Sequence, residues 1–205
     1  MSQFQNHFYR IADGLAETGF AVVDDFLSPT AVQQIFSLHV FNDESFKKAG
    51  IGKETKQLNE EIRGDSILWL DKETAHEYIK NYLARIDDLR LYLKENLYLS
   101  LKDFECHLAA YPPGSFYKRH LDQFKSDDHR RISVITYLNQ NWKDEEGGQL
   151  RMYLESGHLD FLPNAGRMIC FRSDRIEHEV LPATRDRLSI TGWLLDQYSD
   201  LRYLK

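Results

Sequence analysis

The chain has 205 residues, of which 42% are apolar and 13% aromatic, a length and composition that predict one well-buried globular domain and exclude a disordered chain. With 26 basic and 32 acidic side chains, the formal net charge is −6. Because the charge is negative and the sequence has no cluster of Lys and Arg, nucleic acid is disfavoured as a partner. No signal-peptide run starts the chain and no apolar run could span a bilayer, so we expect a cytoplasmic protein without membrane contact.

The first hundred residues favour helices with short strands between them. Apolar residues recur at helical spacing over residues 3–18, and Gly19 fits the stop of that helix. A short strand is expected over residues 20–26. Ser28 followed by Pro29 predicts the start of a helix that runs to about Val40. A longer helix is expected over residues 73–97, because its apolar stripe suits packing against a sheet.

From about Asp103 onward the pattern changes to short β-forming runs separated by turn residues. The clearest runs are residues 104–111, 131–138, 149–154, 167–171, 178–181 and 188–195. Many short strands without a long helix between them predict a double-sheet architecture of jelly-roll type. We therefore predict an α+β fold with a mainly β core and N-terminal helices packed on one sheet.

This pattern predicts a single domain over residues 1–205, without a linker or an internal repeat. Residues 1–100 would form a mostly helical support layer together with the first strands. Residues 101–195 would form the β core, and residues 196–205 a C-terminal tail.

His120, Asp122 and His178 form the candidate metal site. Two imidazoles and one carboxylate are the ligand set that holds non-haem Fe(II) and leaves other coordination positions open. Residues i and i+2 of a strand project from the same face, so His120 and Asp122 can reach one metal together. His178 would come from a strand that is distant in sequence but adjacent in space.

A second HxD pair, His158 and Asp160, competes for the same role. It lies so close to His178 in sequence that the intervening residues allow little more than a hairpin. His120 instead precedes the strongly β-forming run 131–138, which leaves room for a strand that returns across a jelly roll. We therefore prefer His120 with Asp122, and expect His158 and Asp160 in an exposed turn.

Arg187, at the start of the last predicted strand, indicates a co-substrate that carries a carboxylate. A turn through Pro182 and Thr184 would bring it alongside the strand that carries His178. A guanidinium there could hold one end of a dicarboxylate through two hydrogen bonds while the other end chelates iron. The competing explanations are a surface salt bridge between Arg187 and Asp186, and a hydrogen-bonded core position for His178.

Several sequence blocks, in the same order, resemble the prolyl hydroxylases of the Fe(II)/2-oxoglutarate oxygenase superfamily, of the oxygen-sensing hypoxia-factor type and its bacterial relatives. The blocks are residues 19–27, 62–70, 111–122, 137–142, 147–151, 170–180 and 187–193, which extend over almost the whole chain. The resemblance implies a double-stranded β-helix with His120, Asp122 and His178 on iron. It also implies that Arg187 binds the C5 carboxylate of 2-oxoglutarate.

The same resemblance assigns further residues to the co-substrate and to the entrance. Those that would share or line the 2-oxoglutarate pocket are Tyr111, Tyr137, Leu150, Thr191 and Trp193. Arg63, Asp65 and Arg130 match positions near the entrance, where a salt bridge would order the polar segment 43–64, which resembles a substrate-covering loop. From the residues alone, the pocket positions would be ordinary core and segment 43–64 a surface connection. The stretch between Asp122 and Tyr137 is more charged and slightly longer than the usual turn of the family.

The function implied by the resemblance is hydroxylation of a prolyl residue at C4 in a cytosolic protein. Fe(II) would be the cofactor, 2-oxoglutarate and O2 the co-substrates, succinate and CO2 the products, and ascorbate a candidate reductant. Bacterial relatives suggest a translation-machinery protein as the substrate. The alternatives are the same chemistry on a free amino acid or another small molecule, a nucleic-acid demethylase, which the acidic charge disfavours, and a non-catalytic jelly-roll binding module. Nothing in the sequence indicates an oligomeric state.

Overall fold

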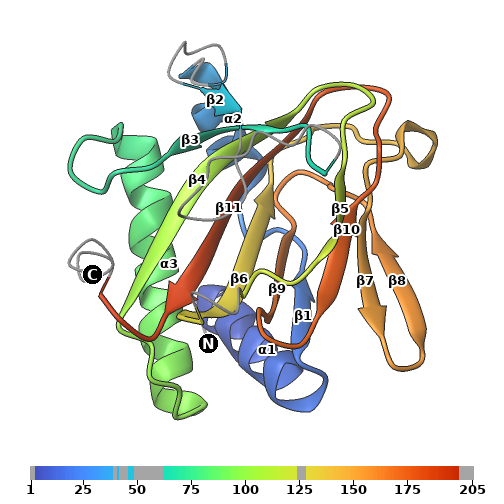
Figure 1. Cartoon of the computed structure of the whole chain (residues 1–205). Coiled ribbons are helices and arrows are strands. Elements are labelled where there is room, and N and C mark those ends of the chain that lie inside the picture. The colour runs from blue at the N-terminus through green and yellow to red at the C-terminus, as the bar shows by residue number, and fades with distance from the viewer. Residues whose placement is uncertain (1–2, 39–40, 42–45, 49–61, 124–127, 199–205) are drawn as a thin grey trace.

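Two antiparallel β-sheets form the core of the structure, a computed structural model that describes residues 3–38, 41, 46–48, 62–123 and 128–198 (Figure 1). The strands are β1 (Phe20–Val23), β2 (Lys47–Lys48), β3 (Ser66–Trp69), β4 (Asp103–Tyr111), β5 (Tyr117–His120), β6 (Arg130–Tyr137), β7 (Leu150–Leu154), β8 (Gly157–Phe161), β9 (Met168–Arg172), β10 (Glu177–Val180) and β11 (Arg187–Leu195). The larger sheet has the order β1-β9-β6-β11-β4-β3-β2, and the smaller sheet has the order β5-β10-β7-β8. A short 3-10 helix spans Asp144–Glu146.

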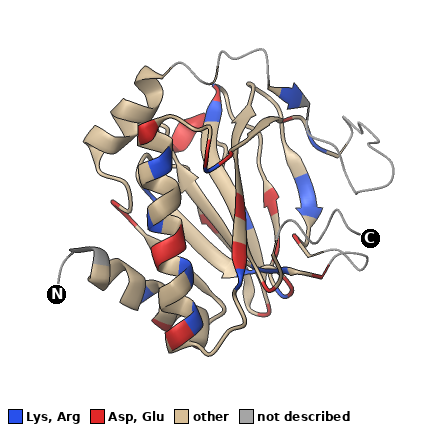
Figure 2. Ribbon diagram, turned by 90° about the vertical axis from the view of Figure 1, so that its left-hand side faces the viewer, with Lys and Arg blue, Asp and Glu red and all other residues tan. Residues whose placement is uncertain are grey.

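The described part of the first half of the chain contains three α-helices, α1 (Gln3–Glu17), α2 (Pro29–Ser37) and α3 (Glu77–Asn96). Helices α1 and α3 lie over one face of the larger sheet, and charges of both signs are interspersed along the helical layer (Figure 2). The Ser28 hydroxyl accepts a hydrogen bond from Ala31 N at 3.2 Å, which caps α2 as its sequence predicts. None of the described helices combines the length and apolar character that a bilayer crossing requires.

The larger sheet separates two hydrophobic clusters. On its outer face the buried stripe of α3, which includes Ile86 and Leu89, packs with Val134 and Ile190. The inner cluster fills the space between the two sheets and consists of Ala109, Tyr111, Ile135, Tyr137, Leu150, Met152, Ile169, Phe171, Ile176 and Val180. The predicted mainly β fold with helices on one sheet is confirmed, whereas the single-domain division stays a prediction.

Several element ends differ from their predicted positions. Strand β1 ends at Val23 rather than residue 26, because Asp25 has a φ of 58°, which an extended strand does not accommodate. Helix α3 begins at Glu77 rather than residue 73. The Asp71 carboxylate accepts hydrogen bonds from the backbone N–H groups of Glu73 and Thr74, and this turn competes with a helical start. Helix α2 ends at Ser37, and Val40 lies outside the described residues.

The second HxD pair lies in a strand, so the predicted turn at His158 and Asp160 is wrong. Both residues belong to β8, where they are exposed as expected. Asp160 is the cross-strand partner of Arg151 and accepts two hydrogen bonds from its guanidinium, at 2.8 and 2.7 Å. This pairing stabilises β8 on the edge of the smaller sheet.

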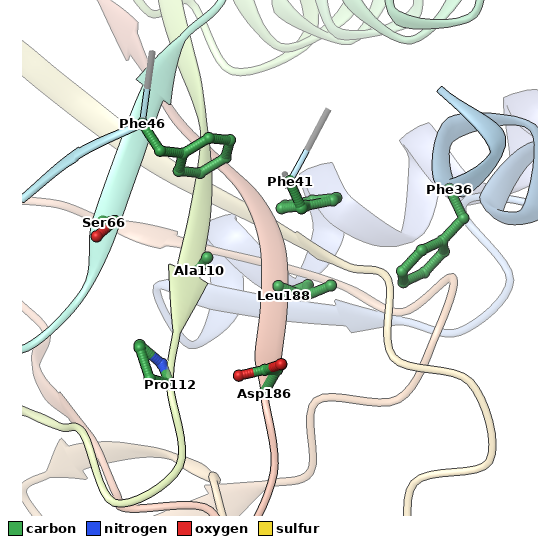
Figure 3. Close-up of a pocket in the computed structure, with 8 residues that line it drawn as sticks. All are labelled: Phe36, Phe41, Phe46, Ser66, Ala110, Pro112, Asp186 and Leu188. Atoms are coloured by element: carbon green, nitrogen blue, oxygen red, sulfur yellow. The ribbon is translucent and has the colours of Figure 1, made fainter. Parts of the chain in front are cut away.

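A cavity of about 400 Å³ lies on the helix-facing side of the larger sheet (Figure 3). Its lining consists of Phe36, Phe41, Phe46, Ser66, Ala110, Pro112, Asp186 and Leu188. Ala110 and Leu188 are cross-strand partners that directly adjoin Tyr111 and Arg187 in sequence. Because successive side chains of a strand point to opposite faces, this cavity is separate from the space between the sheets.

Candidate metal centre and co-substrate site

His120 and His178 come together because β5 and β10 are neighbours in the smaller sheet. The two residues are cross-strand partners, and their ring centroids lie 4.3 Å apart. His120 is 15% exposed at its side chain and His178 only 4%. The second histidine is therefore supplied by a strand that is distant in sequence and adjacent in space, as predicted.

Asp122 completes the cluster from a bend that follows β5, not from the strand itself as the i, i+2 argument assumed. Its Oδ1 lies 3.4 Å from His120 Nε2 and 3.7 Å from His178 Nε2, and one ligand atom of each residue lies within 4.8 Å of the others. Ligand atoms about 2.1 Å from a metal in cis positions lie about 3 Å apart. The cluster therefore fits a metal ion, and its two imidazoles and single carboxylate suit Fe(II).

Backbone carbonyls fix which nitrogen of each ring faces the metal position. His120 Nδ1 lies 2.7 Å from the carbonyl oxygen of Lys118, and His178 Nδ1 lies 3.2 Å from that of Ile176. Since a carbonyl can only accept, Nδ1 of each neutral ring carries the hydrogen and donates it. Each Nε2 is left with a free lone pair, which is the form that binds a metal.

The charge states of the cluster also suit a metal. Burial lowers the pKa of His178 to about 4, against an opposing effect of Asp122, so its ring is neutral at neutral pH. Burial alone would raise the pKa of Asp122. Its neighbours His178 and His120 and the Ser133 hydroxyl together hold that pKa well below its usual range. The cluster thus offers an ionised carboxylate and a neutral imidazole, neither of which must lose a proton to bind a metal.

Arg187 provides a buried positive charge in the space between the sheets. It is 2% exposed, its Nε donates to the carbonyl oxygen of Gly148 at 2.8 Å, and a terminal nitrogen donates to Tyr137 Oη at 3.3 Å. None of the described carboxylates lies within ion-pair distance of this guanidinium, which excludes the surface salt bridge with Asp186. An unpaired buried cation is costly, and a ligand carboxylate would compensate it.

The path between Arg187 and His178 differs from the predicted one. Arg187 begins β11 in the larger sheet, whereas His178 belongs to β10 in the smaller sheet. The connection through Pro182 and Thr184 therefore crosses from one sheet to the other. The two side chains can consequently act on opposite ends of one molecule held between the sheets.

The other residues assigned to 2-oxoglutarate divide between two ends of this space. The Arg187 guanidinium lies 5.2 Å from the Tyr111 ring and 5.0 Å from the Tyr137 ring, and Leu150 is buried in the same cluster. Thr191 lies further along β11, with its hydroxyl 3.2 Å from that of Ser189.

Trp193 lies at the metal end instead, about 20 Å along the strand from Arg187. It is the cross-strand partner of Ser133, whose hydroxyl binds Asp122. The role of Trp193 toward the co-substrate stays a prediction.

The spacing between the two ends fits a short dicarboxylate. Ser133, which contacts Asp122, and Tyr137, which contacts Arg187, are four positions apart on β6. These positions are about 13 Å apart in an extended strand. A span of this order, shortened by the lengths of the Asp122 and Arg187 side chains, suits the five-carbon chain of 2-oxoglutarate.

Known proteins with the same architecture support this interpretation. The sequence model of the 2OG-Fe(II) oxygenase superfamily matches residues 106–195. The crystal structure of a Pseudomonas putida prolyl-4-hydroxylase is 41% identical, with a TM-score of 0.85 over 93% of this chain and 100% of that chain. The chain belongs to the prolyl hydroxylases of this superfamily. Members of the superfamily use Fe(II) and 2-oxoglutarate together with O2.

Two further members of the family are similar over most of this chain. A prolyl hydroxylase from Trichoplax adhaerens, solved with a peptide fragment of the hypoxia inducible factor oxygen degradation domain, has a TM-score of 0.88 and 28% identity over 99% of this chain and 94% of that chain. Human Egl nine homolog 1 is 34% identical over 87% of this chain. The chain spans only 44% of the length of that human protein.

Two of the residues assigned to the entrance, Arg63 and Asp65, pair with each other in the structure. Arg63 donates two hydrogen bonds to Asp65, at 2.7 and 2.6 Å, and its guanidinium lies over the Tyr117 ring at 4.4 Å. Arg130, the third of these residues, pairs with Glu105 at 3.0 Å. Most of segment 43–64 lies outside the described residues, so its role as a substrate loop stays a prediction.

Sequence reasoning missed His107, which forms an aromatic group beside the metal position with Trp69 and the already assigned Trp193. The buried His107 ring lies 5.0 Å from the Trp69 ring and 5.4 Å from the Trp193 ring, and Arg130 covers Trp193 at 3.5 Å. Burial is the main reason that the pKa of His107 is lowered to about 3, which keeps its ring neutral. His107 Nδ1 and Trp193 Nε1 are buried without a hydrogen-bond partner among the described residues. The group becomes visible only when β3, β4 and β11 are placed side by side.

Replacing Asp65 with alanine should lower the free energy of unfolding by about 3 kcal/mol, because it removes the buried acid that pairs with the largely buried Arg63 guanidinium. The matched control is Asp160→Ala, which removes the partner of Arg151 on the more exposed face of β8. That loss should be below about 1 kcal/mol. Urea denaturation of the two variants measures both values. Equal losses would show that the Arg63–Asp65 pair contributes no more to the free energy of unfolding than a surface pair does.

Proposed function

We propose that this chain is an Fe(II)- and 2-oxoglutarate-dependent dioxygenase that hydroxylates a prolyl residue of a cytosolic protein at C4. The observation that carries the proposal is the placement of two features around one space. His120, Asp122 and His178 cluster at one end, and the buried Arg187, unpaired by any described acid, lies toward the other. This arrangement suits a co-substrate with a chelating group at one end and a carboxylate at the other.

The chain's own residues would position the reactants. His120, Asp122 and His178 would hold the metal from one side and leave the opposite side open. Arg187, assisted by the Tyr137 hydroxyl, would orient the C5 carboxylate of 2-oxoglutarate. When bound, Fe(II) supplies the oxidative chemistry that couples decarboxylation of 2-oxoglutarate, with release of succinate and CO2, to hydroxylation of an unreactive C–H bond. The apolar cluster between the sheets would exclude water from that chemistry.

A protein is the proposed substrate. The Trichoplax relative binds a peptide, which favours a peptide over a small molecule for this chain as well. The unpaired nitrogens of His107 and Trp193 offer hydrogen bonds to a polar group beside the metal position. The resemblance to bacterial relatives favours a translation-machinery protein, and with it the cytoplasm as the proposed compartment.

Metal removal tests the enzymatic proposal directly. Protein stripped with a chelator should release no succinate from 2-oxoglutarate in air, and added Fe(II) with ascorbate should restore the release. Mg(II) is the control ion and should restore nothing, because it has no accessible redox chemistry. A purified protein that binds neither Fe(II) nor 2-oxoglutarate would rule the proposal out.

The substrate is tested by comparing the proteins of cells with and without the gene. A peptide that carries hydroxyproline only when the gene is present identifies the target, and the purified chain should then hydroxylate a synthetic copy of it. Full turnover of a free amino acid without any protein partner would favour the small-molecule alternative instead.

A further inference from the structure

A pair of buried hydroxyl groups lies behind the carboxylate of the candidate metal centre. Ser133 of β6 is fully buried, and its Oγ donates a hydrogen bond of 2.6 Å to Asp122 Oδ2. The Oγ of Ser173, equally buried, lies 2.9 Å from Ser133 Oγ. The three side chains come from three separate parts of the chain and meet only in the folded structure.

The chemistry of a hydroxyl group sets the direction of this chain of hydrogen bonds. Each serine has one hydrogen to donate, and the carboxylate of Asp122 can only accept. The hydrogen of Ser133 is used by Asp122, so the Ser133–Ser173 contact requires Ser173 to be the donor. The hydrogen bonds therefore run from Ser173 to Ser133 to Asp122. Successive bonds in one direction polarise and strengthen one another.

The two oxygens of Asp122 consequently face different partners. Oδ2 is held by Ser133, whereas Oδ1 is the oxygen that lies near Nε2 of both His120 and His178. Asp122 lies in a bend outside β5, so no strand pairing fixes its side chain. A hydroxyl on the neighbouring sheet is a direct means of fixing it.

Ser173 also connects the two halves of the metal centre through its backbone. Its carbonyl oxygen accepts a hydrogen bond of 3.2 Å from Gln123 N, next to Asp122, and its own N–H donates to the Arg131 carbonyl at 3.1 Å. Three positions further on, the Ile176 carbonyl holds the His178 ring. The segment 173–176 therefore holds both the residue next to Asp122 and the ring of His178.

We propose that Ser133, supported by Ser173, is a positioning residue that holds Asp122 so that Oδ1 alone is presented to the metal. The inference rests on the proposed metal site, whose ligands it assumes. It predicts that the hydroxyl of Ser133 contributes to metal affinity and to the coordination geometry. The competing explanation is that Ser133 merely satisfies buried polar groups within the sheet.

Co(II) is the probe that separates these explanations, because its d–d absorption reports coordination geometry without turnover. Ser133→Ala should weaken Co(II) binding by roughly 10–100-fold, the range for outer-shell partners of metal ligands, and should alter the d–d spectrum. The matched control is Thr136→Val on the opposite face of β6. It removes an equally buried hydroxyl, which lies 3.0 Å from Tyr82 Oη of α3, on the other side of the sheet from Asp122. Its Co(II) affinity and spectrum should equal those of the wild type.

A double-mutant cycle tests the proposed direction of the hydrogen bonds. Ser173→Ala alone should weaken Co(II) binding less than Ser133→Ala does, and it should add nothing in the Ser133→Ala background, because Ser173 acts through Ser133. Folded Ser133→Ala with wild-type affinity and spectrum would overturn the proposal, as would fully additive losses. Should Ser133→Ala not fold, Ser173→Ala alone decides, and unchanged binding overturns the proposal. A wild-type protein that fails to bind Co(II) would instead count against the metal site itself.

Discussion

Asp122→Ala should abolish succinate release and weaken divalent metal binding by more than roughly 100-fold, the upper end of the losses seen for outer-shell partners. Asp122 is the only anionic ligand of the cluster, and its Oδ1 lies near both imidazoles. Without it, two imidazole ligands remain, and they supply no negative charge to offset that of a dication. Isothermal titration of the metal-free protein with Mn(II), which avoids oxidation, measures the affinity beside the succinate assay.

The matched control for Asp122→Ala is Asp160→Ala, in the other HxD pair. Asp160 is exposed on β8 and pairs with Arg151, so its loss should leave metal affinity and succinate release within about twofold of the wild type. The comparison decides between the two HxD pairs experimentally. Reduced metal binding in Asp160→Ala together with normal binding in Asp122→Ala would reverse the assignment made from the sequence.

The strands of the core could be predicted because their signals are local. The β-forming run 131–138 corresponds to β6 within one residue at each end, and 188–195 corresponds to β11 in the same way. Apolar alternation and turn residues determine such segments without reference to the rest of the chain. The predicted position of a helix end is less accurate where one side chain, such as that of Asp71, forms hydrogen bonds that compete with the first helical turn.

The site could be predicted only as far as its residues carry a spacing or a family motif. His120 and Asp122 were recognised through their i, i+2 spacing, although Asp122 has left the strand that the spacing assumed. Ser133 contacts Asp122 across eleven positions and two elements, a separation that no local pattern indicates. Likewise Arg130 pairs with Glu105 across β11, which requires the register of three strands. Such contacts depend on long-range pairing, which a single sequence does not specify.

Arg187→Ala should raise the KM for 2-oxoglutarate by roughly 30-fold or more, since removing one partner of a buried, hydrogen-bonded charge pair costs about 2–5 kcal/mol. The guanidinium is 2% exposed and none of the described acids pairs with it, so the variant leaves no protein carboxylate unpaired in the core. Metal affinity should stay at the wild-type value, because Arg187 contacts none of the three ligands. Succinate release at increasing 2-oxoglutarate concentrations and Mn(II) titration measure the two effects separately.

Two variants show whether charge or geometry is responsible for this effect. Arg187→Lys keeps the positive charge but loses the planar fork that binds a carboxylate through two hydrogen bonds, so its KM should lie between those of the wild type and Arg187→Ala. Arg151→Ala removes an arginine from the outer face of the smaller sheet and should leave the KM unchanged. If Arg187→Ala lost metal and 2-oxoglutarate affinity equally, Arg187 would support the fold of the site rather than bind the co-substrate. A selective loss, graded from arginine through lysine to alanine, would identify this buried charge as the group that recognises the far carboxylate.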